Sequence, residues 1–167
     1  LEIIGINAFR FCHALKNLSF PKLKKIDNYA FMNCSNLNII NAPNVEYIGS
    51  NAFHRDYQLT NLNVPKCTFV GTEAFRQTGL TTITLSDQLT TLGEGAFMNA
   101  TNLDGDLTFN ELTTLKGSTF QNCIGLKSVK APKVTTIGDH CFSGCTSLNN
   151  IEAPLLTTIG YNAFANS

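Results

Sequence analysis

The sequence predicts an α/β solenoid of about seven 22-residue repeats, with residues 1–167 forming a single domain. Three regularities predict it. An aliphatic residue lies five residues before each repeated Phe, and all five prolines lie 12 residues after one. The repeated Phe residues follow at intervals of 22, with one interval of 23: Phe9, Phe31, Phe53, Phe75, Phe97, Phe120, Phe142 and Phe164. A unit this short buries its apolar residues only against the next unit, so equivalent side chains are expected to stack.

Two extended segments are expected in each unit. The pattern Leu-x-x-Ile-x-Ala-Pro at residues 148–154 alternates apolar and polar positions, which predicts a short strand. Pro154 ends this strand because proline cannot donate a hydrogen bond to a strand ladder. The Thr pairs that follow, such as Thr157-Thr158, favour extended backbone and predict a second short strand.

The rest of the unit predicts a short helix. In residues 138–148, apolar side chains lie at Cys141, Phe142, Cys145 and Leu148. The spacing i, i+1, i+4 and i+7 is typical of one to two helical turns. This segment supplies the α part of the predicted fold class.

Composition excludes several classes of protein. Twelve basic residues balance 12 acidic ones, and only 14% of the residues are charged, so we expect no nucleic-acid partner. The 43% hydrophobic content is sufficient for a core and argues against disorder. The sequence contains no run of 18 apolar residues, so we expect no membrane insertion, and no signal-peptide pattern is visible.

The unit resembles the leucine-rich repeat of the Treponema pallidum type, which is found in BspA-like surface proteins. The motif Ile-Gly-x-x-Ala-Phe-x-x-Cys-x-x-Leu is nearly verbatim at residues 48–53 and 137–145, and the resemblance covers essentially the whole chain. It implies a right-handed horseshoe with parallel strands on its concave face. It also implies a cell-surface or secreted location and adhesion to host proteins or other cells, but it supplies no ligand.

The outward residues of the first strands are the candidate binding residues, and we call them the polar strip. They are Asn17, Ser19, Asn41, Asn61, Asn63, Thr82, Thr84, Asp106, Thr108, Ser128, Lys130, Asn150 and Glu152, with Ile39 among them as the apolar exception. Amides and hydroxyls donate and accept hydrogen bonds without strong charge, which suits a protein surface or a carbohydrate. The absence of aromatic residues from the strip argues against carbohydrate.

These observations predict a non-enzymatic module that binds a protein partner through its concave face. Two alternatives remain open: a structural spacer that displays another domain, and a carbohydrate-binding surface protein. Two departures from the repeat mark the middle of the chain. Leu80 comes one residue early, and the extra residue in Asp104-Gly105-Asp106 predicts a β-bulge. The two carboxylates there lack the other oxygens of a Ca²⁺ loop.

The six cysteines are expected to be free thiols in the core. Four of them lie three residues after a repeated Phe: Cys12, Cys34, Cys123 and Cys145. Neighbours in this column would point in parallel at a separation of ~4.8 Å, which is poor disulfide geometry. Cys67 and Cys141 replace apolar residues at other inward positions.

No catalytic or metal site is predicted, and no cofactor. His140, Cys141 and Cys145 lack the second pair of ligands that a zinc site needs. His54 lies near Asp56 in the sequence, and we expect a surface contact between them.

The ends of the chain predict self-association. The sequence starts inside a repeat at Leu1 and stops just after Phe164, and neither end has a polar capping unit. Solenoids need such caps for solubility. We therefore expect the chain to be part of a longer one, or its ends to be covered by partners.

Overall fold

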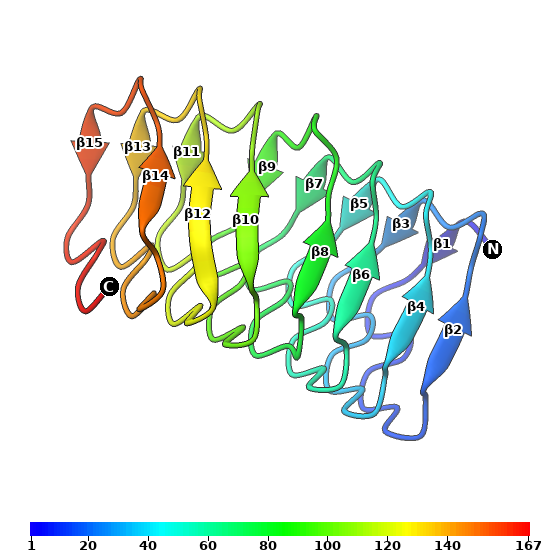
Figure 1. Cartoon of the computed structure of the whole chain (residues 1–167). Helices are drawn as coiled ribbons and strands as arrows, with labels where there is room; N and C mark the ends of the chain where they lie inside the picture. Colours follow the sequence, from blue (N-terminus) through cyan, green and yellow to red (C-terminus); the bar gives the residue numbers. More distant parts are fainter.

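The computed structural model describes residues 1–167 as a column of about seven stacked turns, which we call rungs (Figure 1). Each rung contributes one longer and one shorter strand. The longer strands are β2 (Asn17–Ser19), β4 (Ile39–Asn41), β6 (Asn61–Asn63), β8 (Thr82–Thr84), β10 (Gly105–Thr108), β12 (Leu126–Lys130) and β14 (Asn150–Glu152). The shorter strands are β1 (Ile3–Ile4), β3 (Lys25–Ile26), β5 (Tyr47–Ile48), β7 (Phe69–Val70), β9 (Thr91–Leu92), β11 (Thr114–Leu115), β13 (Thr136–Ile137) and β15 (Thr158–Ile159).

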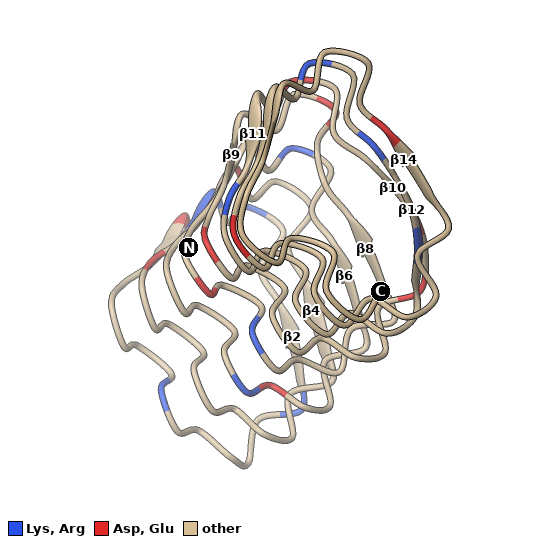
Figure 2. Ribbon diagram, turned by 90° about the vertical axis from the view of Figure 1, so that its left-hand side faces the viewer, with Lys and Arg blue, Asp and Glu red and all other residues tan.

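All strand pairs are parallel, and both predicted extended segments are confirmed. Viewed from the C-terminal end of the column (Figure 2), the rungs enclose one interior, with β9 and β11 on one side and β10, β12 and β14 on the other. We call the outer surface of the longer strands the long-strand face. The shorter strands form the opposite face, and turns close the third side of each rung.

The predicted helix is wrong, since the structure contains no helix, and the α/β class is corrected to a β-solenoid. In each rung, the residue two positions before the repeated Phe and the residue two positions after it have left-handed backbone, with φ between 51° and 75°. A right-handed helix requires negative φ at every residue, so these two positions interrupt it. No segment that could cross a membrane as a helix is present.

The turn side is joined from rung to rung by hydrogen bonds that a helix would not make. The N–H groups of Asn7, Phe9 and Phe11 donate to carbonyls of the next rung at 2.8–3.1 Å. The alternate residues donate within their own rung, as Arg10 does to the carbonyl of Asn7 at 3.1 Å. The same pattern recurs in every rung except the last, so the turn side is a third ladder of inter-rung hydrogen bonds.

The interior is built around a column of phenylalanine rings, which confirms the predicted stacking. All eight repeated Phe residues take part, and neighbouring ring centroids lie 5.2–5.6 Å apart with interplanar angles of 4–18°. The six inner rings, from Phe31 to Phe142, are fully buried. Offset stacking of aromatic rings adds to the free energy gained by burying their surface.

The cysteines are free, and five are buried, as the repeat predicts; Cys12 is half-buried at the first rung. The thiol of Cys34 donates to the carbonyl of Phe9 in the preceding rung at 2.9 Å, and the thiols of Cys123 and Cys145 bond to the equivalent Phe carbonyls. Burial raises the pKa of the Cys34 thiol to about 12. Each of these thiols therefore acts as a small core residue that also satisfies a backbone acceptor.

The ladder of longer strands is interrupted twice, whereas the ladder of shorter strands is interrupted once. Hydrogen bonds join β2 to β4, β6 to β8, and β10 through β12 to β14, whereas β4 is not paired with β6 and β8 is not paired with β10. At the β8–β10 break, one backbone bond remains just before the two strands, from the Asp104 N–H to the Thr81 carbonyl at 3.0 Å. Among the shorter strands, the break lies between β9 and β11. The β8–β10 and β9–β11 breaks flank the insertion at Asp104-Gly105-Asp106, which changes the repeat length there.

Candidate binding surface

The structure brings the whole polar strip onto the long-strand face. Alternation along each strand turns the central residue, such as Leu62, into the core and its two neighbours outward. The register aligns these neighbours across rungs, for example Asp106 with Ser128 and Ser128 with Asn150. All thirteen residues are exposed except Ser128, which is half-buried. The strip therefore forms two parallel rows along the column.

The C-terminal part of the polar strip pairs its charges internally. Lys130 Nζ lies 3.1 Å from Glu152 Oε1, and the Ser128 hydroxyl donates to Asp106 Oδ1 at 2.7 Å. Lys127 Nζ lies 2.8 Å from Asp104 Oδ1, and this hydrogen bond lowers the pKa of the Asp104 carboxyl. Exposed ion pairs of this kind add little stability. Because Lys130 is paired with Glu152, the C-terminal part of the polar strip contains no unpaired cation.

A register shift lies at the predicted place, but the extra residue is on the partner strand: Gly105 pairs with Leu126 and Asp106 with Ser128, so Lys127 of β12 is left without a partner in β10. The register between β10 and β12 shifts between Gly105 and Asp106. Gly105 has φ of 91°, a conformation that a residue with a Cβ rarely adopts. The carboxylates of Asp104 and Asp106 bond to Lys127 and Ser128 respectively, and no group of three metal-ligating side chains forms here or elsewhere in the chain.

A groove lies over the first interruption of the long-strand ladder, between β4 and β6. We call it the amide groove; its volume is about 580 Å³, and it is lined by Asn38, Ile39, Ile40, Asn41, Thr60, Asn61 and Asn63. No charged residue lines it. The carboxamides of Asn61 and Asn63 have no hydrogen-bond partner in the chain, and Asn41 has only a 3.4 Å bond to the Ser19 hydroxyl. Its apolar contribution comes from Ile39, which is 53% exposed.

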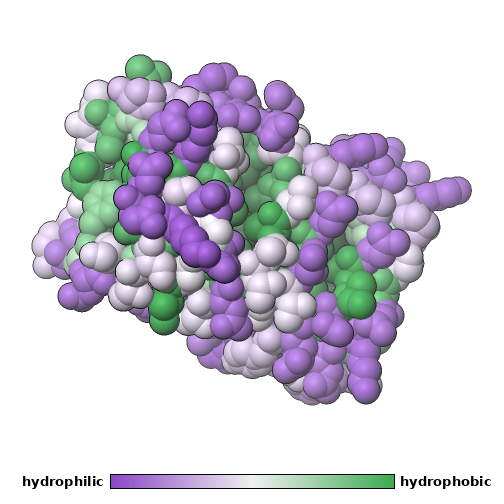
Figure 3. All heavy atoms as spheres, viewed as in Figure 1, coloured by the Kyte–Doolittle hydropathy of each residue, from purple (hydrophilic) through white to green (hydrophobic).

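A second, smaller groove lies over the interruption between β8 and β10. We call it the aliphatic groove; its volume is about 220 Å³, and it is lined by Ile83, Thr84, Leu85, Asp106, Leu107, Thr108 and Phe109. Ile83 and Leu107 occupy core positions of their strands but are only half-buried, unlike Leu62 and Val129 in the neighbouring rungs. Figure 3 shows apolar surface in the middle of this face, with further apolar surface towards the C-terminal end at its left.

Sequence reasoning did not predict the two grooves. The early Leu80 and the extra residue at Asp104-Gly105-Asp106 were signals for the aliphatic groove, because both change the spacing between equivalent residues of neighbouring rungs. The amide groove had a weaker signal. Ile39 is an aliphatic residue at an outward position where the other rungs carry polar side chains.

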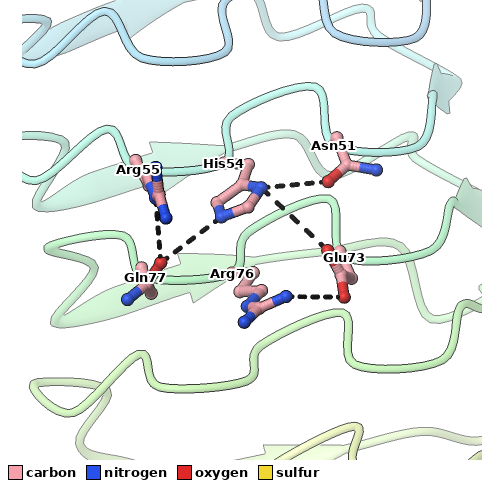
Figure 4. Close-up of polar contacts among 6 residues, drawn as sticks. All are labelled: Asn51, His54, Arg55, Glu73, Arg76 and Gln77. Carbon is pink, nitrogen blue, oxygen red and sulfur yellow. Dashed lines mark hydrogen bonds and ion pairs between the residues drawn. The ribbon is translucent and has the colours of Figure 1, made fainter.

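The expected surface contact between His54 and Asp56 is wrong. Asp56 is fully buried and His54 is 7% exposed, and no hydrogen bond or ion pair joins them. The His54 ring instead lies between Asn51 and Gln77, whose side-chain oxygens are 3.0 Å and 3.4 Å from its two nitrogens (Figure 4). Its pKa is lowered, mainly by burial.

The rest of this polar cluster, on the turn side, joins two rungs. Arg76 Nη1 donates to Glu73 Oε1 at 2.8 Å, and Arg55 Nε donates to Gln77 Oε1 at 3.2 Å (Figure 4). The cluster, Asn51, His54, Arg55, Glu73, Arg76 and Gln77, holds no serine, cysteine, threonine or lysine that could act as a nucleophile. It has the composition of an inter-rung polar network and not of a catalytic site.

Two half-buried aromatic side chains lie on the opposite face. Tyr47 and Phe69 stack at 4.5 Å between centroids with an interplanar angle of 8°, and Lys25 Nζ lies 5.1 Å from the Tyr47 ring centroid. Both faces of the Tyr47 ring are covered, by Phe69 and by Lys25. The pair therefore offers no open tyrosine face on which a sugar would stack.

Comparison with known proteins agrees with this architecture. The family described as the BspA type leucine rich repeat region matches residues 1–104 and 113–167 in six copies. Among proteins with curated descriptions, none matches the chain.

Three solved structures resemble the chain. A leucine-rich repeat protein from Bacteroides ovatus is 32% identical over 96% of this chain, with a TM-score of 0.86. The T. pallidum leucine rich repeat protein is 22% identical over 96% of the chain, with a TM-score of 0.63, and the match covers 67% of that protein. A leucine rich cell surface protein from Faecalibacterium prausnitzii is 20% identical over the whole chain, with a TM-score of 0.51, and the match covers 73% of it.

The chain spans 43% of the length of the Bacteroides ovatus structure. The last two likenesses, at 22% and 20% identity, concern the fold alone. The match of the repeat family to nearly every rung, together with the stacked Phe column and the parallel strands, establishes the relationship. The chain belongs to the BspA-type leucine-rich repeat family.

Proposed function

We propose that this chain is a non-enzymatic binding module that recognises a protein partner through its long-strand face. The observation that carries the proposal is the two rows of neutral polar side chains on this face together with the amide groove of about 580 Å³ between them. Leucine-rich repeat folds are commonly used for protein binding. Many neutral donors and acceptors around an apolar centre are the composition of a protein interface, with an apolar core and a polar rim.

We further propose a cell-surface or secreted location and a role in adhesion. The BspA-type family and the description of the Faecalibacterium prausnitzii relative as a cell surface protein support this location. The small number of unpaired charges on the long-strand face disfavours a nucleic-acid partner, which would need a basic surface.

The proposal is tested by changing charge on the two faces separately. The chain is screened on an array of purified extracellular protein domains, alongside the double variant Asn61→Arg with Lys130→Glu. The matched control carries Thr114→Arg with Lys116→Glu, two exposed positions on the opposite face at β11. We expect the long-strand variant to lose the domains that the native chain binds and the control to retain them. Equal binding by both variants, or no binding by the native chain, would favour a structural spacer and contradict the proposal.

A further inference from the structure

One position of the repeat, three residues after the repeated Phe, forms a side-chain hydrogen bond between rungs. The carbonyl of a repeated Phe accepts the N–H of this position in its own rung, as Phe9 does from Cys12 at 3.1 Å. In three cases it also accepts a thiol from the next rung, so that it has two donors. The longer strands of these three rung pairs, β2–β4, β10–β12 and β12–β14, are hydrogen-bonded. The three thiol bonds run from Cys34 to Phe9 at 2.9 Å, from Cys123 to Phe97 at 3.1 Å and from Cys145 to Phe120 at 3.0 Å.

Asp56 occupies this position in the third rung, and its contact with the second rung is one donor short. Asp56 Oδ1 and the Phe31 carbonyl both accept the backbone N–H of Cys34, at 2.8 Å and 2.9 Å, so the two oxygens lie close together. The Phe31 carbonyl has no second donor, and Asp56 Oδ2 has no partner. All three residues are fully buried, so bulk water does not reach this contact.

The first interruption of the long-strand ladder lies between the same two rungs. β4 follows Cys34 and β6 follows Asp56, and the repeat has its regular length here. The two strands are still neighbours, whereas β8 and β10 lie further apart. The N–H of Ala42, next to β4, has no acceptor, although the equivalent N–H of Ala131 donates to the Glu152 carbonyl at 2.8 Å. A small closing movement would therefore complete the ladder at this place.

A missing donor alone does not separate the longer strands. Thr78 occupies the same position in the fourth rung, and its hydroxyl donates to the Phe75 carbonyl of its own rung at 2.9 Å. β6 and β8 are nevertheless paired. The contact between the second and third rungs differs because a buried carboxyl group faces a carbonyl there. Two acceptors without a proton between them repel each other in such a buried setting.

We propose that Asp56 is a proton-controlled switch for the contact between the second and third rungs. When Oδ2 carries a proton, the carboxyl donates to the Phe31 carbonyl, the third rung moves onto the second, and β4 pairs with β6. When the proton is lost, the two acceptors keep the strands apart, and the amide groove lies open between them. This inference goes beyond the proposed function, because it concerns the conformation of the column and requires no partner.

No second charge competes for control of this proton. The titratable group that faces Asp56 from the second rung is the Cys34 thiol, and burial raises the pKa of that thiol to about 12, so it stays neutral. Thr78, on the side of the fourth rung, does not titrate. His54 and Arg55 bond instead to side chains of the turn-side cluster. Burial raises the pKa of Asp56 to about 8, so the two forms exchange between neutral and mildly alkaline pH.

Amide hydrogen exchange, followed by nuclear magnetic resonance on the 167-residue chain, tests the switch. The N–H of Ala42 is the probe, because it gains an acceptor only when β4 pairs with β6. The N–H of Ala131 is the matched control, because it occupies the same rung position beside a paired strand. From pH 6 to pH 9, we expect the protection factor of Ala42 to fall at least about tenfold more than that of Ala131. A loss of global stability lowers both factors alike, and the comparison removes it.

Two variants assign the effect to Asp56. In Asp56→Asn, the side-chain amide donates to the Phe31 carbonyl at every pH, so Ala42 should be protected at both pH 6 and pH 9. Glu46→Gln removes an exposed carboxylate of the third rung and should keep the native pH dependence.

Two results would overturn the switch. One is an equal change at Ala42 and Ala131 in the native chain, and the other is a pH dependence that persists in Asp56→Asn. If Asp56→Asn does not fold, the comparison of the two amides in the native chain still decides. None of these results alters the proposed function, which the array of extracellular domains decides separately.

Discussion

The carboxylate of Asp56 accepts a hydrogen bond at 2.8 Å from the backbone N–H of Cys34 in the preceding rung. Asp56 stands where most other rungs carry Cys or a small residue, three positions after the repeated Phe, and it is fully buried. Its second oxygen, Oδ2, has no hydrogen-bond partner. A carboxylate in this setting is costly to ionise, and burial raises its pKa from 3.8 to about 8.

This raised pKa predicts that the chain is less stable at neutral pH than at mildly acidic pH. The folded state holds the proton of Asp56 more tightly than the unfolded state, in which the pKa is near 3.8. The stabilisation is complete below about pH 4 and is lost as the pH rises towards 8, and it amounts to about 6 kcal/mol at most. Urea denaturation between pH 4.5 and 8.5 measures the slope.

Asp56→Asn supplies the control for this slope. Asparagine keeps an acceptor for the Cys34 N–H but cannot ionise, so the variant should be more stable than the native chain at pH 8 by at least about 1 kcal/mol. Its free energy of unfolding should depend less on pH between 4.5 and 8. An unchanged slope would show that another group is responsible.

The phenylalanine column predicts a large cost for removing one ring. Phe75→Ala leaves a cavity between two stacked rings and should lower the free energy of unfolding by about 3–5 kcal/mol. Tyr57→Ala removes an aromatic ring that is 51% exposed and should change it by less than about 1 kcal/mol. Chemical denaturation of both variants measures the difference, and similar costs would show that the column is not the main source of stability.

The left-handed positions predict opposite effects of two substitutions at one site. Ser118 has φ of 54°, and its side chain makes no hydrogen bond in the chain. Ser118→Gly should be neutral or stabilising, because glycine adopts this conformation without steric cost. Ser118→Val should destabilise by about 1–2 kcal/mol, because a β-branched residue is strained there. Equal thermal stability of the two variants would show that this turn relaxes to another conformation.

Burial of the thiols predicts slow modification in the native state. Five cysteines are buried, and burial raises the pKa of thiols such as Cys34 and Cys67 to about 12, so little thiolate forms at pH 8. A colorimetric thiol reagent should therefore react quickly with Cys12 alone, and Cys12→Ser should remove this fast phase. In denaturant all six should react; a lower number would indicate a disulfide.

The two ends of the column predict self-association of residues 1–167. Ile3, Ile6 and Phe11 are more than half exposed at the first rung, as are Ile159 and Tyr161 at the last. Static light scattering should show a mass that increases with concentration. Ile159→Asp with Tyr161→Asp should shift the chain towards monomer, because charges at one end oppose stacking. A monomer at every concentration would contradict this prediction.

The repeat predicts most of the fold because side-chain period and packing are tied together. The Phe spacing alone was sufficient to predict the stacked column, and alternation was sufficient to predict which residues of the longer strands point outward. The helix was wrong because apolar residues at i, i+1, i+4 and i+7 also suit two consecutive turns. Asparagine at positions such as Asn51 and Asn99 was the available signal, since it tolerates left-handed backbone.

The grooves and the buried carboxylate depend on relations between rungs. The break between β4 and β6 occurs where the repeat has its regular length of 22 residues, so the repeat length does not predict it. The sequence proximity of Asp56 to His54 predicts a surface contact, whereas the place of Asp56 in the column, three residues after Phe53, decides its burial. Position within the repeat predicts environment here better than proximity along the chain.

The turn-side ladder has a consequence for how such genes change in length. Every interior rung receives hydrogen bonds from one neighbour and donates the same set to the other, as Phe53 does to Ala74 and Phe75 to Ala96. A duplication of 22 codons in phase with this pattern therefore adds a turn whose donors, acceptors and ring are all matched on both sides. Unequal recombination can therefore add or remove complete 22-residue rungs, and selection can act on the length of the column without compensating mutations that restore folding.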